Sequence, residues 1–94
     1  MSFTNRNFCK SFTLTLNGNT QALATQECSE VIVSSSDAVT YYDYRNPGVG
    51  FLVPANTIFT FRGLTDSNQL SANGTSNKVV YYRTQYFTSL TDTR

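Results

Sequence analysis

The sequence contains no histidine and no tryptophan, two cysteines, and only 14% charged residues. Protein zinc sites are built mainly from cysteine and histidine ligands at close spacing, so this composition predicts no metal site. Without histidine, a serine or cysteine nucleophile lacks its commonest general base, and the six acidic residues are isolated in polar segments. We therefore expect no catalytic residues, no cofactor and no enzymatic activity.

Charge of one sign is also scarce, because seven Lys and Arg residues against six Asp and Glu residues leave a formal net charge of +1. Nucleic-acid binding proteins need a basic patch, whereas these cations are spread singly along the chain. No segment approaches the roughly 20 apolar residues of a membrane-spanning helix. We expect neither nucleic acid nor a membrane as partner. A near-neutral chain repels its own copies little, which favours self-association.

The chain is rich in two groups of residues instead: 37 Ser, Thr, Asn and Gln, and 13 Phe and Tyr. Apolar and polar residues alternate in several short segments, and no window shows the spacing of an amphipathic helix. Turn residues recur about every ten positions, at spacings typical of β-sandwiches and small barrels. The sequence predicts one all-β domain, a small β-sandwich or β-barrel of about seven or eight antiparallel strands with essentially no helix. We expect a short edge strand at most near Leu70, in an otherwise loop-like polar segment.

A local hairpin is expected near the N-terminus. Alternation in "KSFTLTL" places Phe12, Leu14 and Leu16 on one face, and "NGN" follows as a turn before "TQALAT". With Gly18-Asn19 as the two loop residues, Leu14 would lie opposite Leu23 and Cys9 opposite Cys28. The register therefore predicts Cys9 and Cys28 as a close thiol pair or disulfide.

The aromatic residues are the remaining signal for function. Tyrosine doublets at 41–42 and 81–82 place one ring on each face of a strand, and one small core cannot hold all 13 aromatic rings. Cross-strand packing explains part of the set. Outward tyrosines are also typical of protein interfaces and of surfaces that stack on sugar rings. Stacking with single-stranded nucleic acid is less favoured, because the chain has little positive charge.

The middle of the chain resembles small structural proteins of tailed bacteriophage virions. The resemblance rests on "EVIVSSSDAVTYYDYRNPGVGFLVPANTIFTFRG", with its apolar turn motif at Phe51–Thr57, and on "QLSANGTSNKVVYYRTQ". It implies a non-enzymatic virion protein, foremost a capsid decoration or cement protein that binds the major capsid protein or tail proteins. The alternative that it leaves open is a tail, baseplate or fibre module that binds a carbohydrate or receptor.

Such a protein would be synthesised in the host cytoplasm and located in the virion, which agrees with the lack of an apolar, signal-like run in the opening residues. We expect residues 1–7 to form a flexible arm, residues 8–90 the β-sandwich domain, and residues 91–94 a polar tail. The arm, with Phe3 and Arg6, is predicted to order against a partner. A second predicted contact surface comprises Tyr42, Tyr44, Arg45 and Pro47.

Overall fold

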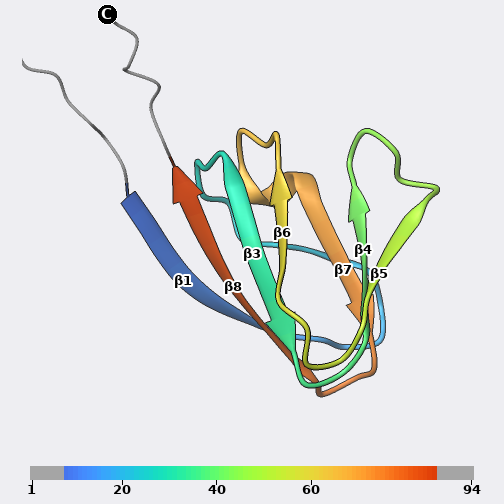
Figure 1. Cartoon of the computed structure of the whole chain (residues 1–94). Coiled ribbons are helices and arrows are strands. Elements are labelled where there is room, and N and C mark those ends of the chain that lie inside the picture. Colours follow the sequence, from blue (N-terminus) through green and yellow to red (C-terminus); the bar gives the residue numbers. More distant parts are fainter. Residues whose placement is uncertain (1–7, 87–94) are drawn as a thin grey trace, which may run out of the picture.

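The computed structural model describes residues 8–86, which form two four-stranded antiparallel sheets (Figure 1). The strands of the first sheet, in spatial order, are β1 (Phe8–Thr15), β8 (Val79–Tyr86), β3 (Glu30–Ser35) and β6 (Phe59–Arg62). The second sheet has the order β2 (Gln21–Ala22), β7 (Leu70–Gly74), β4 (Val39–Asp43) and β5 (Gly50–Val53). One short 3-10 turn, η1 (Ser67–Gln69), precedes β7. The predicted all-β fold of antiparallel strands is confirmed, and of the sandwich and the barrel that the sequence left open, the structure is a sandwich.

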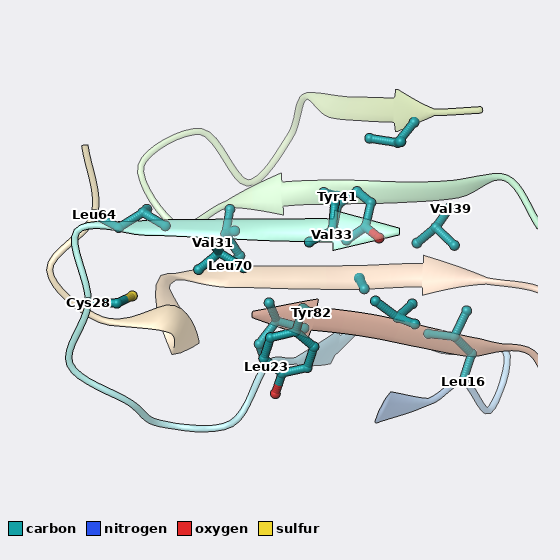
Figure 2. Packing of buried hydrophobic residues seen from close by; sticks show 13 residues of the cluster. Leu16, Leu23, Cys28, Val31, Val33, Val39, Tyr41, Leu64, Leu70 and Tyr82 are labelled. Carbon is teal, nitrogen blue, oxygen red and sulfur yellow. The ribbon is translucent and has the colours of Figure 1, made fainter. Parts of the chain in front are cut away.

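The core lies between the two sheets, as Figure 2 shows. Alternation places Val31 and Val33 of β3 inward, toward Tyr41 of β4 and Leu70 of β7 in the opposite sheet. Burying an aliphatic side chain of this size stabilises a fold by about 1.5–3 kcal/mol. The tyrosine doublets divide as expected, since Tyr41 and Tyr82 are buried and Tyr81 is exposed. The full set of buried apolar residues is Leu16, Leu23, Cys28, Val31, Val33, Val39, Tyr41, Val53, Leu64, Leu70, Ala72, Val80 and Tyr82.

The predicted N-terminal hairpin is wrong. All eight residues of β1 pair with β8, so that Leu14 lies opposite Val80, and the segment after the turn crosses to the other sheet. There Leu23 donates its N–H to the Leu70 carbonyl at 3.0 Å, and Ala24 donates its N–H to the Tyr82 hydroxyl at 2.8 Å. The long alternating β8 gives β1 more paired residues than the short, alanine-containing segment 20–25 does. Non-local pairing therefore prevails over the local turn signal.

The prediction of a close cysteine pair is wrong for the same reason. Cys9 lies opposite Gln85 on β8 and is exposed, whereas Cys28 is buried and donates its N–H to the Thr65 carbonyl at 3.2 Å. Both cysteines are free thiols.

The polar segment before β8 is more ordered than its composition suggested. Residues 70–74 form β7, an inner strand between β2 and β4 rather than an edge strand. Asp66 caps η1 by accepting the Asn68 N–H at 3.0 Å, and the same carboxylate accepts the Gln26 N–H at 3.1 Å. The buried Ser67 hydroxyl donates to the Ala24 carbonyl.

Within the described part of the chain, no helix has the length and apolarity needed to cross a membrane.

Candidate interaction surfaces

Large apolar side chains are exposed along β5 and the loop that precedes it, a surface that we call the β4–β5 corner. Tyr44 is 57% exposed, Val49 70%, Phe51 47% and Leu52 59%. These residues follow one another over nine positions, at the edge of the second sheet and at the right of Figure 1. Several large apolar side chains exposed this close together at one sheet edge of a small domain are typical of a surface that binds a partner.

The loop at this corner is held by its own hydrogen bonds. The Asp43 carboxylate accepts the Arg45 N–H at 2.9 Å and pairs with the Arg45 guanidinium at 2.8 Å. Asn46 donates its N–H to the Asp43 carbonyl, and Val49 donates its N–H to the Asn46 carbonyl, at 2.8 and 3.1 Å. The hydrogen bonds from Arg45 lower the pKa of Asp43. A loop constrained in this way loses little conformational entropy when it binds.

The aromatic residues of the corner form a shallow hollow of about 300 Å³ on the outer face of the second sheet. Tyr42, Tyr44 and Pro47 line it. The Arg45 guanidinium lies over the Tyr44 ring, 5.3 Å from its centroid. Gly50 leaves room for this arrangement, because a Cβ there would lie only 3.1 Å from the Tyr42 ring. The hollow therefore presents aromatic faces beside a cation, a combination suited to protein recognition.

A second, more apolar pocket of about 340 Å³ opens between the sheets beside the same corner. Three phenylalanines connect the edge strands β5 and β6 of the two sheets. The centroid of the Phe51 ring lies 4.8 Å from that of Phe59 and 5.8 Å from that of Phe61. Tyr41 lies 5.2 Å from Phe61 at the pocket wall, and Asp43 is one of its few polar groups. A pocket of this volume and lining can accept an apolar side chain of a partner.

A third hollow, of about 500 Å³, lies on the outer face of the first sheet. The exposed Tyr81 ring stands between Thr13 of β1 and Ser34 of β3, which lie opposite it on the two neighbouring strands. Arg83 and the exposed Ile58 also line the hollow. An exposed ring flanked by hydroxyl groups and a guanidinium is a surface on which a sugar can stack and form hydrogen bonds.

The structure brings together four of the residues that the sequence singled out. Tyr42, Tyr44, Arg45 and Pro47 all belong to the β4–β5 corner, and three of them line one hollow. The other two predicted contact residues, Phe3 and Arg6, lie outside the described residues.

Sequence reasoning missed the exposed part of β5 and the third hollow. Val49, Phe51 and Leu52 were not among the predicted contact residues, although "VGFLV" does not alternate as a half-buried strand does. Ile58 and Tyr81 come together only through the pairing of non-adjacent strands, which no local pattern records.

Potential metal ligands and the buried cysteine bear on the chemistry that the described residues offer. Residues 8–86 contain no group of three or more His, Cys, Asp and Glu side chains placed to hold a metal ion. Burial, followed by the nearby charges of Asp66 and Glu27, raises the pKa of the Cys28 thiol to about 11. Its reactive thiolate form is therefore scarce at neutral pH.

Comparison of the chain with models of protein families, with curated proteins and with solved structures finds no match.

Proposed function

We propose that this protein is a non-enzymatic structural component that binds neighbouring subunits of an assembly through its β4–β5 corner. The single observation that supports it best is the exposure of Tyr44, Val49, Phe51 and Leu52 on β5 and the loop before it, which the Asp43–Arg45 pair constrains. Exposed apolar side chains lower the solubility of a protein unless a partner covers them. A constrained loop loses little conformational entropy when it binds such a partner.

The assembly that we propose is a tailed bacteriophage virion, with the protein as a capsid decoration or cement protein. The resemblance of residues 30–85 to small virion proteins supports this identity. A compact sandwich with several apolar surfaces and a net charge of +1 is compatible with a protein packed among other subunits. A tail or baseplate position agrees with the same features, and the copy number distinguishes the two.

The experiment is a quantitative mass-spectrometric inventory of purified particles from the virus that encodes the chain. Hundreds of copies per particle indicate the capsid, and a few or a few dozen copies indicate the tail. Absence of the protein from intact particles would reject the proposal.

The surface is tested in the same particles with the double variant Tyr44→Ser, Arg45→Ser, which we expect to reduce incorporation without unfolding the domain. The matched control combines Tyr81→Ser with Lys78→Ser, which also removes one exposed tyrosine and one cation, but outside the corner. Incorporation of both variants at the wild-type level would show that the contact lies elsewhere.

Carbohydrate binding is a second candidate function, which the hollow around Tyr81 favours. A sugar ring stacked on Tyr81 would lie within reach of the hydroxyl groups of Thr13 and Ser34. Glycan-array screening followed by titration of the best ligand tests it. Tyr81→Ala should abolish the binding and Tyr44→Ala should not. If no glycan binds, this candidate is rejected.

A further inference from the structure

We propose that the partner of the β4–β5 corner is a second copy of the chain, and that β5 pairs with β5 of this copy in antiparallel orientation. The two sheets of order β2-β7-β4-β5 would then become one continuous eight-stranded sheet. This inference deepens the proposed function and rests on it, because it names the partner of the same surface.

The argument begins with the four edge strands of the sandwich, which are β1, β6, β2 and β5. Natural proteins prevent unwanted pairing at such edges with charged side chains or with very short strands. Lys10 is exposed on β1, Arg62 is exposed on β6, and β2 has only two residues. β5 has four residues, Gly50–Val53, and none of these protections.

The composition of β5 favours a second copy over a different partner strand. A two-fold axis places each strand beside an identical one, so any charge on the strand is present twice in the interface. β1 would bring two Lys10 residues into one interface, and β6 two Arg62 residues, each ion-paired with Glu30 at 3.1 Å but with its side chain still 78% exposed. β5 brings only apolar groups together, and its neighbouring charges, Asp43 and Arg45, already neutralise each other.

Pairing at this edge would also cover the side chains that are otherwise exposed. Phe51 lies opposite Tyr41 on the inner face of the sheet, and Leu52 lies opposite Thr40 on the outer face. Side chains of a paired strand would therefore contact Phe51 on the inner face of the sheet and Leu52 on its outer face. Pro54 has no N–H and limits the pairing to the strand itself, which keeps the register short and defined.

The test is the association of the purified full-length chain, measured by sedimentation equilibrium over a wide range of concentrations. We expect a dimer whose dissociation constant rises about tenfold or more in Leu52→Lys, because each copy loses an apolar contact and gains a like charge. Leu52 is already exposed, so lysine is tolerated in the monomer, and far-UV circular dichroism verifies its fold. The matched control, Ile58→Lys, changes a residue next to β6 that is even more exposed than Leu52, and this variant should associate like the wild type.

Hydrogen exchange locates the interface independently of the variants. Amides of residues 50–53 should exchange more slowly at high protein concentration than at low concentration, and those of β1 should not change. A monomer at all concentrations, an unimpaired dimer of Leu52→Lys, or protection at β1 instead of β5 would each overturn the inference. A monomer in solution that still enters particles through the corner would overturn self-pairing alone, whereas failure to enter particles would reject the proposed function.

Discussion

Cys9 and Cys28 are both free thiols, but their surroundings differ. Cys9 is exposed on the edge strand β1, whereas Cys28 is buried and its pKa is raised to about 11. Access and thiolate content both govern the rate of thiol modification, so burial protects Cys28 in two ways.

We predict that a thiol reagent at pH 8 modifies Cys9 in the native protein and modifies Cys28 only after unfolding. Mass spectrometry of proteolytic peptides gives the site of modification. Cys9→Ser serves as the control, because the native variant should remain almost unlabelled. Native labelling of Cys28 as fast as in urea would contradict its burial.

Gly50 and Gly48 lie two positions apart, but only Gly48 has space around it for a side chain. A Cβ at Gly50 would lie 2.5 Å from the Thr40 methyl carbon and 3.1 Å from the Tyr42 ring, whereas a Cβ at Gly48 meets nothing within 4 Å. We expect Gly50→Ala to lower the free energy of unfolding by about 1–3 kcal/mol through overpacking. Gly48→Ala should change it by no more than about 0.5 kcal/mol. Urea denaturation of both variants measures the difference, and equal stabilities would contradict the described packing around Gly50.

At the scale of elements, the sequence predicts strands and faces better than it predicts partners. Alternation correctly placed Phe12, Leu14 and Leu16 on the core face of the first strand. Which strand lies beside which depends on residues far apart in the chain, such as the pairing of Leu14 with Val80. The predicted cysteine pair was wrong together with the hairpin, because the hairpin register was its only support.

The candidate surface was likewise predictable only in part. A loop of turn residues between aromatic strands marks Tyr42, Tyr44, Arg45 and Pro47 as exposed from the sequence alone. The exposure of Phe51 and Leu52 follows instead from the position of β5 at a sheet edge, which is a property of the assembled sandwich.

The order of the loop between β4 and β5 should decrease at acid pH, because Asp43 becomes protonated there. Hydrogen bonding from Arg45 lowers the pKa of Asp43 in the folded protein. The Asp43–Arg45 contact therefore stabilises the loop fully above the unfolded pKa of about 4, and this stabilisation is lost as the pH falls through the folded pKa. We expect the NMR amide signal of Arg45 to shift, and its exchange with water to accelerate, below about pH 4. Asp43→Asn retains an acceptor oxygen without the titrating charge and should remove this dependence. A wild-type loop unchanged down to pH 2 would contradict it.

At the scale of the whole molecule, the core resists ionisation in alkali. Burial raises the pKa of Tyr41 from 10.0 to about 12, and the pKa of Cys28 rises from 9.0 to about 11. Because the folded values are raised, the stability from these groups is full below the unfolded values and is lost as pH rises through the folded values. We predict that the free energy of unfolding falls between pH 9 and about 12, most steeply between pH 10 and 11 where both groups contribute, as urea denaturation at each pH measures. Cys28→Ala should weaken the first part of this fall, and a flat profile would contradict the prediction.

The size of the domain gives the last prediction. A chain of 94 residues buries a smaller fraction of its surface than a larger domain does, so association should supply part of its stability. A dimer that forms only from folded monomers stabilises the fold by mass action, and its melting temperature then increases with protein concentration. We expect this increase for the wild type and for Ile58→Lys, and a smaller increase for Leu52→Lys, in differential scanning calorimetry over a hundredfold range of concentration. If the wild type melts at one temperature throughout that range, the folded domain is stable without a second copy.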